Sequence, residues 1–494
     1  EPKVMRTKES AVAKTAPGPK QAPASPVSAA MHTPALPAGV ELARAPTGPG
    51  RLADDYIAFL GDSVTPFHAV ANVVARFAAA GFHERRLDAA LATKAGERFW
   101  VIHPDGKTIL AFVVGTKSPV LSGYTLVGAH TDSPDLRLRL NPVESVAGTA
   151  LLTTQLHGGL IRRAWLDRPL ALAGAVWQVV RDARGKPRFH PHSGQPVVTR
   201  KLVHVDAPLA VIPDLAIHLD REKNDVGAID PQTMLNAVCS GLLDSEGLTR
   251  ALSDAAGVAL DELDGFDLHL VPYARPMRTG IDGSMITGPR QDDLAMVYAG
   301  MQGLIESVER DPRPLHTRVA AFFDAEETGS QTASGAGSDF LRSVLLRVAR
   351  RHPATSAAHD PEQALLASVV LSADMAHALH PNFQDVHDKA HAPLMNRGMV
   401  VKVNTNDRYA TTGETTALIR AVCDAAQVPL QAFVVKQNMG CGSTIGPITA
   451  ARLGARTIDV GAPMWAMHST SETTGALDMD WAAAMMRSFL AGGK

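Results

Sequence analysis

The chain has 494 residues, of which 45% are hydrophobic and 20% are charged, a composition typical of a soluble globular protein with two or three domains. A formal net charge of −2 without runs of Lys or Arg predicts no nucleic-acid partner, and apolar stretches shorter than about 18 residues predict no membrane span. Three cysteines without a CxxC pair exclude a disulfide scaffold and favour a reducing, cytoplasmic location.

The first segment, residues 1–50, is rich in Pro and Ala and poor in aromatic and β-branched residues. Such a segment buries too little apolar surface to offset the entropy of ordering, so we expect a disordered tail. It lacks the apolar core of a secretory signal. Its scattered Lys and Arg leave a transit peptide open as an alternative, although no amphipathic pattern supports one.

Ordered structure is expected to begin with two helices within residues 53–82, where apolar residues recur at helical spacing. Ser63 or Thr65 is a suitable N-cap for the second helix. Residues 98–115 hold two apolar runs around a Pro-Asp-Gly turn, which predicts a β-hairpin. Residues 125–134 form an apolar strand that ends in polar residues.

The pattern changes between residues 136 and 265, where short β-like runs are separated by turns. The runs are ALLTTQLHG, ALAGAVWQVVR, QPVVTRKLVHV and LAVIPDLAIHL. They predict an inserted all-β sandwich or barrel. Strands alternate with helices again over 266–494, so we expect an α/β domain made of residues 51–135 and 266–494.

The stretch FFDAEETGS, residues 322–330, places Glu326 and Glu327 side by side where an apolar run meets a glycine turn. Adjacent side chains on a strand point to opposite faces. This alternation gives the two carboxylates different surroundings and, we expect, different tasks. Asp324, in the same stretch, is expected to be structural.

Five segments end in acidic or histidine residues at or near the end of an apolar run or the start of a helix. They are VGAHTD (127–132), RQDD (290–293), FFDAEE (322–327), VVLSADMAH (369–377) and APMWAMH (462–468). Each has an ordinary alternative: a hydrogen-bonded turn histidine, a helix N-cap or a solvated turn. Five such coincidences are improbable together. Histidines with hard carboxylates suit Zn²⁺, Mn²⁺ or Co²⁺, and two ions sharing a bridging carboxylate would use five ligands well.

Several motifs resemble those of the aspartyl aminopeptidases. They are HTDSP (130–134), DAEETGS (324–330), SADMAHALHPN (372–382), KVNTNDRYAT (402–411), GCGSTIGP (440–447) and MHSTSE (467–472). The resemblance runs in order from about residue 52 to the end. It implies a three-layer α/β/α metallopeptidase domain interrupted by a β-rich dimerisation domain, and dimers that assemble into a dodecamer.

The resemblance also implies the ligands of two divalent metal ions per subunit, zinc with cobalt or manganese as alternatives. The implied ligands are His130, Asp292, Glu327, Asp374 and His468. Asp292 would bridge the ions. His130 and Asp374 would hold one, and Glu327 and His468 the other.

The same resemblance gives Asp132 the task of orienting the ligand His130, and Glu326 that of general base. The implied activity is hydrolysis of the first peptide bond of peptides that begin with Asp or Glu. Glu326 would take a proton from the metal-activated water and deliver it to the leaving amine.

Four further residues are assigned to the substrate by resemblance: Lys402, Tyr409 and His377 around its acidic side chain, and His218 reaching a neighbouring subunit's site. Lysine is a strong point-charge partner for a carboxylate. The ordinary alternatives are a surface lysine at a strand end for Lys402 and a half-buried strand histidine for His218.

The chain departs from the usual family pattern at RQDD, where Asp293 adds a carboxylate beside the bridge and can shift a neighbour's pKa by like-charge repulsion. Thr328 and Ser471 also replace usual residues, and Ser471 removes an arginine near His468. These departures leave two alternative functions open. One is a two-metal aminopeptidase of broader specificity, and the other is a weakly active assembly or cargo protein that keeps the oligomeric cage.

Overall fold

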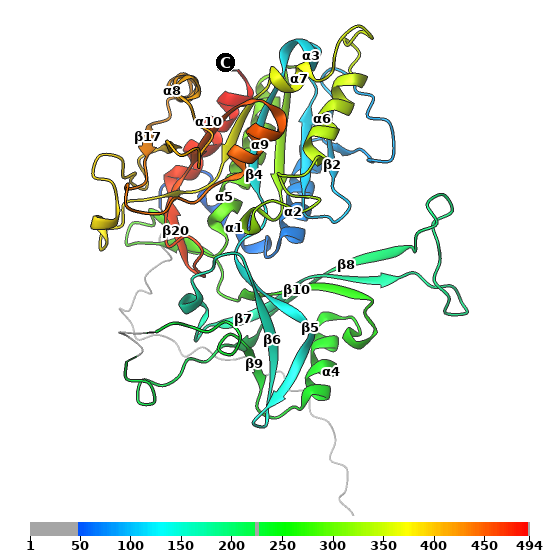
Figure 1. Ribbon diagram of the computed structural model, residues 1–494, viewed down its shortest axis with the longest axis vertical. Helices are drawn as coiled ribbons and strands as arrows, with labels where there is room; N and C mark the ends of the chain where they lie inside the picture. Colours follow the sequence, from blue (N-terminus) through cyan, green and yellow to red (C-terminus); the bar gives the residue numbers. More distant parts are fainter. Residues whose placement is uncertain (1–47, 223–226, 493–494) are drawn as a thin grey trace, which may run out of the picture. The chain divides into compact units, whose positions relative to one another are not determined.

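The computed structural model describes residues 48–222 and 227–492 (Figure 1). The expected tail, residues 1–50, lies outside the described residues except for its last three. The helices are α1 (Ala53–Asp62), α2 (Pro66–Ala79), α3 (Pro119–Ser122), α4 (Ser245–Ala256), α5 (Gln291–Arg310), α6 (Phe340–Arg351), α7 (Gln363–Leu366), α8 (Gly413–Ala426), α9 (Ile445–Leu453) and α10 (Ala476–Leu490). No helix in the described ranges combines the length and the apolar character needed to cross a membrane.

A nine-stranded mixed sheet forms the centre of the larger α/β part. In spatial order its strands are β1 (His83–Glu84), β2 (Arg98–Ile102), β3 (Ile109–Val113), β13 (Thr317–Phe323), β4 (Tyr124–His130), β14 (Val369–Ala373), β18 (Arg456–Gly461), β16 (Met399–Lys402) and β17 (Leu430–Phe433). The central strands β13, β4, β14 and β18 are parallel, as expected for strands connected through helices. The expected hairpin is confirmed as the antiparallel pair β2–β3.

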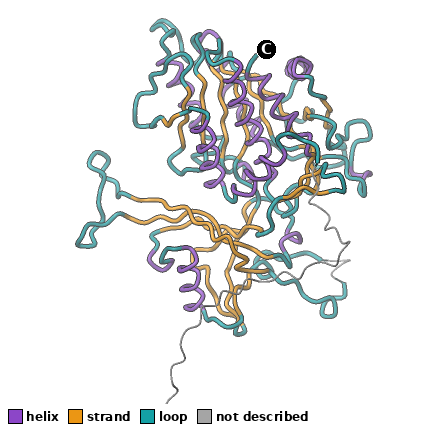
Figure 2. Tube along the Cα trace, turned by 180° about the vertical axis from the view of Figure 1, so that it is seen from behind, coloured by secondary structure: helices purple, strands orange, loops and turns teal. Residues whose placement is uncertain are grey.

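Two hydrophobic cores cover the two faces of this sheet, because successive strand residues point to opposite sides. On β13, Ala320 and Phe322 belong to the core that contains α1, α2, α5, α8 and α10. Val319 and Ala321 belong to the core that contains α6 and α9. The helices therefore form a layer on each face of the sheet (Figure 2), which is a three-layer α/β/α arrangement.

Six strands close into a barrel in the order β10-β5-β6-β9-β8-β7. Their bounds are β5 (Asp135–Val146), β6 (Thr149–His157), β7 (Pro169–Val179), β8 (Val198–Val211), β9 (Ala237–Ser240) and β10 (Gly265–Pro272). A separate core fills the barrel, with α4 packed on it through Leu248 and Leu252. The β-rich architecture agrees with the expectation, and the domain boundaries 136–265 stay a prediction.

Two details of this segment were predicted wrongly. Residues 212–219 are not a strand: β8 ends at Val211, and Pro213 lacks the N–H that a strand ladder needs. The helix α4 was not expected. It begins at the N-cap Asp244, whose side chain accepts a hydrogen bond from the backbone N–H of Gly247, and it ends at Gly257 in the left-handed conformation.

A third sheet is made of five short strands from the second half of the chain, in the order β11-β12-β20-β19-β15. Its strands are β11 (Met277–Thr279), β12 (Met285–Gly288), β20 (Glu472–Gly475), β19 (Pro463–Trp465) and β15 (Ala376–His377). The sheet brings segments from before α5 beside segments from the last 40 or so residues. This pairing positions several residues of the site described next.

Candidate active site

Three neighbouring parallel strands carry four of the predicted site residues at their carboxyl ends. His130 is the last residue of β4, and Asp374 directly follows β14. Glu326 and Glu327 lie in a short 3-10 turn after β13. Because β13, β4 and β14 are adjacent in the sheet, these ends share one edge, where open α/β sheets place their ligands.

Asp292 and His468 reach the same place from other parts of the chain. Asp292 belongs to the first turn of α5 but departs from helical geometry, with φ −84° and ψ 105°. His468 lies in the loop between β19 and β20 and is half-buried. The structure thus gathers all five predicted metal ligands into three overlapping groups of potential ligands. They are His130 with Asp292, Asp293 and Asp374; His130 with Glu326 and Glu327; and Asp292 with Glu327 and His468.

Asp292 belongs to two of these groups, and its two oxygens face different histidines. Its Oδ1 lies 3.5 Å from His130 Nε2, and its Oδ2 lies 3.4 Å from His468 Nε2. Glu327 Oε1 lies 3.4 Å from the same His468 nitrogen. Within each group the potential ligand atoms lie within 4.8 Å of one another.

The residues present fit a divalent metal. Asp292 Oδ1 and Glu327 Oε1 are buried and have no hydrogen-bond partner among the described residues, and unpartnered carboxylate oxygens in a protein interior are costly unless a cation is nearby. Imidazole nitrogens combined with carboxylate oxygens are the donors that Zn²⁺, Mn²⁺ and Co²⁺ accept. This donor set would leave room for water or a substrate at the ion.

The interpretation of Glu326 and Glu327 by strand alternation was wrong. The strand β13 ends at Phe323, and Ala325 turns the chain with φ 64° before both glutamates. Their separation therefore comes from the turn and not from a pleated strand. Glu327 points to His468, and Glu326 Oε2 lies 4.0 Å from His130 Nε2.

Comparison with known proteins agrees with this geometry. A family model described as aminopeptidase I zinc metalloprotease (M18) matches residues 59–490. A probable M18 family aminopeptidase 2 of Pseudomonas syringae pv. syringae is 38% identical over 443 residues, covering 88% of this chain and 97% of the relative. The chain belongs to the M18 family. It is a zinc metallo-aminopeptidase by family, which confirms the predicted family. The preference for peptides that begin with Asp or Glu stays a prediction.

Solved structures of M18 aminopeptidases also resemble the chain. A cryo-EM structure of the Ape4 and Nbr1 complex has a TM-score of 0.82 and 32% identity, covering 89% of this chain and 85% of that one. A structure of the S. cerevisiae mApe1 dodecamer has a TM-score of 0.75 and 26% identity, covering 89% and 96%. The predicted α/β fold with an additional domain is thereby confirmed.

In this M18 chain Asp132 connects His130, at the end of β4, with the turn that carries Glu326 and Glu327. Its backbone carbonyl lies 2.9 Å from His130 Nδ1, and its carboxylate accepts hydrogen bonds from the backbone N–H groups of Glu326 (3.0 Å) and Glu327 (3.2 Å). His157 Nε2, from the barrel strand β6, lies 3.0 Å from Asp132 Oδ2. Burial would raise the pKa of Asp132, but the two histidines outweigh this and lower it. The predicted orienting position is therefore occupied by an ionised carboxylate.

Glu472 was missed in the sequence, although it closes the motif MHSTSE. Its Oε1 accepts the backbone N–H of His468 at 2.6 Å, and its Oε2 accepts that of Asp292 at 3.2 Å. The side chain is buried in β20, and burial raises its pKa to about 8. Glu472 thus ties together the backbones of two predicted ligands, Asp292 and His468, from distant parts of the sequence. His157 was missed too, because its strand was assigned only to the insertion.

Asp293, the extra carboxylate next to the predicted bridging residue Asp292, is buried and does not face solvent. Its Oδ2 accepts a hydrogen bond from the backbone N–H of His130 at 3.0 Å. The side chain is buried, and burial raises its pKa well above the usual range, with Asp374 and Asp292 adding to the rise. The like-charge repulsion expected in RQDD therefore acts on Asp293 itself.

Of the predicted substrate residues, Lys402 lies beside the ligand Asp374. Its Nζ is 3.6 Å from Asp374 Oδ2, donates to the carbonyl of Met375 at 3.1 Å, and lies 5.2 Å from the ring centroid of Tyr409. The surface alternative for Lys402 is wrong, because the residue is only 2% exposed. An ammonium group held against a carboxylate and an aromatic ring is fixed in position.

The other substrate residues divide into two groups. Phe433 lies between Tyr409 and His377, with ring centroids 6.5 and 5.6 Å away, so these residues share one wall near Lys402. His218 lies in an exposed turn after β8, so the half-buried strand alternative is wrong. No described contact brings His218 to the metal-ligand cluster of its own chain.

Proposed function

We propose that this M18 chain removes an amino-terminal Asp or Glu from peptides with the help of two divalent metal ions. The observation that carries the proposal is Asp292, whose two carboxylate oxygens face His130 and His468 separately. A carboxylate placed in this way suits a bridge between two ions. His130 and Asp374 would complete one site and Glu327 and His468 the other, with zinc in both and cobalt or manganese as alternatives.

The protein groups around the bridge suit general acid–base chemistry. Bound metal ions would supply an acidified water and a polarised scissile carbonyl. The carboxylate of Glu326 accepts the proton of the attacking water and returns it to the nitrogen of the leaving amine. Burial raises the pKa of Glu326 to about 8, against the opposing charge of His130. Bound cations would lower this pKa again, so that Glu326 can act near neutral pH as the carboxylate that accepts a proton.

Asp132 and Glu472 serve this chemistry through the backbone. Asp132 fixes the N–H groups of Glu326 and Glu327, and Glu472 fixes those of Asp292 and His468. Such contacts hold the carboxylates and imidazoles in one geometry before the substrate arrives. Groups held in this way lower the reorganisation needed in the transition state.

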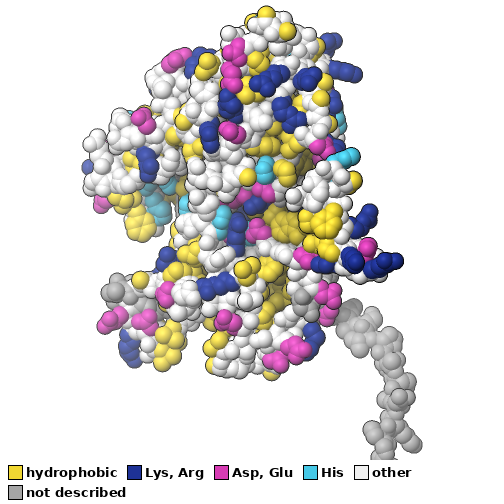
Figure 3. Space-filling model, turned by 45° about the vertical axis from the view of Figure 1, so that its right-hand side comes forward, with side chains coloured by type: hydrophobic (Ala, Val, Ile, Leu, Met, Phe, Trp, Pro, Cys, Tyr) yellow, Lys and Arg dark blue, Asp and Glu magenta, His cyan; other side chains and the backbone are white. Residues whose placement is uncertain are grey.

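Lys402 supports the acidic preference. Its buried ammonium group lies at the edge of the proposed ligand cluster, near Tyr409 and His377, where it can pair with a side-chain carboxylate of the first substrate residue. Basic and acidic side chains are interspersed on the face drawn in Figure 3, and the net charge is only −2. Attraction for an acidic substrate would therefore be local to Lys402 and not a property of the whole surface.

We further propose that the chain forms a homo-oligomer, a dodecamer built from dimers through the barrel, in which His218 reaches the site of a neighbouring subunit. Two facts support this: His218 lies in an exposed turn, and the similar S. cerevisiae structure is a dodecamer. Cytoplasmic location is part of the same proposal, supported by cysteines that form no disulfide in the described residues.

The test is a comparison of kcat/KM on otherwise identical peptides that begin with Asp, Glu, Leu or Lys, together with the metal content of the purified chain. We expect the acidic peptides to be cleaved fastest and two equivalents of metal to be bound. Faster cleavage of the Leu peptide would favour the aminopeptidase of broader specificity. A chain without bound metal and without turnover would favour the assembly or cargo protein.

A further inference from the structure

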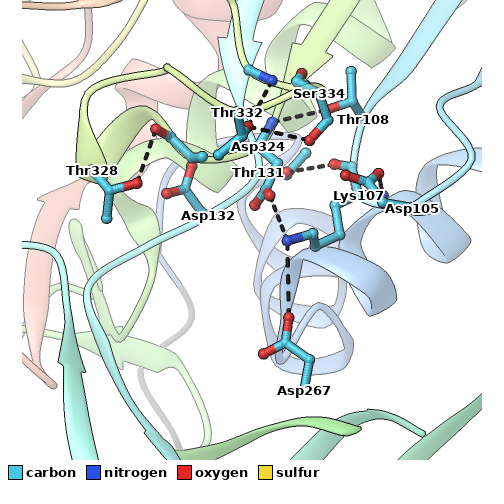
Figure 4. A network of polar contacts seen from close by, with 12 residues as sticks. Asp105, Lys107, Thr108, Thr131, Asp132, Asp267, Asp324, Thr328, Thr332 and Ser334 are labelled. Carbon is cyan, nitrogen blue, oxygen red and sulfur yellow. Dashed lines mark hydrogen bonds and ion pairs between the residues drawn. The ribbon is translucent and has the colours of Figure 1, made fainter. Parts of the chain in front are cut away.

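A second polar network joins the β2–β3 loop to Asp324, the residue before the turn of Glu326 and Glu327, and to Asp267 (Figure 4). Its centre is Lys107, in the loop between β2 and β3. Lys107 Nζ lies 2.7 Å from Asp324 Oδ2 and 3.8 Å from Asp267 Oδ2. Asp324 is the first residue after β13, and Asp267 belongs to the barrel strand β10. One ammonium group therefore contacts the start of the glutamate turn and the wall of the barrel.

The carboxylate of Asp324 depends on this ammonium group. Asp324 is only 1% exposed, and its Oδ1 has no hydrogen-bond partner among the described residues. Burial raises the pKa of Asp324 and the nearby Asp132 raises it further, whereas Lys107, in contact with the carboxylate, and to a lesser degree Arg137 oppose both. Lys107 is the cation in ion-pair contact with Asp324 within the described ranges. A buried carboxylate that loses such a partner is strongly destabilised, because its charge remains uncompensated.

The turn between Asp324 and Glu326 needs support from its surroundings. Ala325 adopts φ 64°, a left-handed conformation that residues with a Cβ rarely adopt and that persists only where neighbouring contacts impose it. Thr108 Oγ1 accepts the backbone N–H of Asp324 at 2.9 Å, and Asp132 accepts the N–H groups of the two glutamates. The turn is thus held at its start by the β2–β3 loop and at its end by Asp132.

We propose that Lys107 is a positioning residue for the peptidase reaction: by pairing with Asp324, it fixes the turn that places Glu326 and Glu327. The proposal rests on the proposed roles of these two glutamates. Without the ammonium group, Asp324 moves toward water or a new partner, and the left-handed turn at Ala325 relaxes with it. A displacement of about 1 Å in a reacting group can lower a rate about 100-fold.

The test compares Lys107→Met, Lys107→Gln and Lys107→Arg in the full-length, metal-loaded chain. We expect Lys107→Met and Lys107→Gln to lower kcat about 10- to 100-fold with KM changed less than about threefold, and Lys107→Arg to recover most of the loss. Metal release to a chelator should be about tenfold faster in the two neutral variants, because Glu327 lies in the same turn.

Arg318→Met is the matched control. Arg318 lies near the start of the same strand β13, is 2% exposed, and pairs with Asp311 at 2.9 Å. Its loss should lower the melting temperature but leave kcat and metal release within about twofold of the unchanged chain. Equal effects of Arg318→Met and Lys107→Met on kcat at matched stability would overturn the proposal.

A double-mutant cycle tests the route through Asp324. In an Asp324→Asn background the buried charge is gone, so Lys107→Met should change kcat and metal release less than about threefold. The same loss in both backgrounds, or unchanged kcat and metal release in Lys107→Met, would contradict the proposal. If the unchanged chain has no aminopeptidase turnover, the proposed function fails, while the metal-release comparison still decides whether Lys107 fixes the turn.

Discussion

At the scale of single residues, the site separates two adjacent glutamates by backbone geometry. Glu327 faces His468, and Glu326 Oε2 lies 4.0 Å from His130 Nε2, because the left-handed Ala325 and the carboxylate of Asp132 shape the turn that holds both. A carboxylate that binds metal has already donated its electron pair. Only the free glutamate can accept a proton from water.

This separation predicts different losses for two equivalent substitutions. Glu326→Gln removes a proton acceptor but no ligand, so we expect kcat to fall about 100- to 10,000-fold with metal content unchanged. Glu327→Gln removes a proposed metal ligand, so its main expected effect is a lower affinity for metal. Metal analysis after dialysis against a weak chelator measures this affinity. Equal metal loss in the two variants would show that the division between them is wrong.

Lys402 gives a prediction about specificity. Lys402→Gln should lower kcat/KM for peptides that begin with Asp about 10- to 100-fold, because a buried, charge-assisted hydrogen bond contributes about 1.5–3 kcal/mol. Peptides that begin with Leu should be affected much less, and they serve as the internal control. Because Lys402 also lies 3.6 Å from Asp374, metal content must be measured in parallel. An equal loss on both peptides would remove Lys402 from the specificity determinants.

At the scale of elements, much of the site follows from strand ends that the sequence indicates. His130 and Asp374 end apolar runs, and parallel pairing brings such ends together. Contacts between distant segments were not predictable: Glu472 meets Asp292 through the pairing of β20 with β12, and His157 meets Asp132 from the barrel. No local pattern in the sequence encodes which strands of the barrel face the peptidase sheet.

The barrel contains a histidine that makes stability depend on pH. His269 is fully buried in β10 beside Asp135 and Asp267. Burial alone would lower its pKa, but the two carboxylates raise it to about 9, above about 6.5 in an unfolded chain. The protonated histidine therefore stabilises the fold fully below pH about 6.5, and this contribution of at most about 3 kcal/mol is lost as the pH rises through 9.

His269→Gln tests this pH dependence. The melting temperature of the unchanged chain should exceed that of the variant by several degrees at pH 6.5, and the gap should narrow toward pH 10. Melting curves of both proteins across this range provide the measurement. A gap that is constant with pH would show that His269 is not protonated in the folded chain.

At the scale of the whole molecule, we propose that His218 serves a neighbouring subunit, because it lies in an exposed turn without a described contact to the candidate ligands of its own chain. The oligomer should have the mass of twelve copies of the 52.3 kDa chain, measured by light scattering. His218→Ala should keep that mass and lower kcat/KM for acidic peptides.

Mixed oligomers test action between subunits. Chains with His218→Ala keep Glu326, and chains with Glu326→Gln keep His218, so oligomers reassembled from both should be more active than either parent. Oligomers of each variant, dissociated and reassembled alone, are the controls. No gain in the mixture would show that His218 does not serve a neighbouring site.

The proposed bridge of Asp292 between two metal ions can be tested by anomalous diffraction at the zinc edge from crystals of the zinc-loaded chain. We expect two peaks per chain, one beside His130 and Asp374 and one beside Glu327 and His468, with one oxygen of Asp292 next to each. A single peak, or two peaks that do not share Asp292, would contradict it.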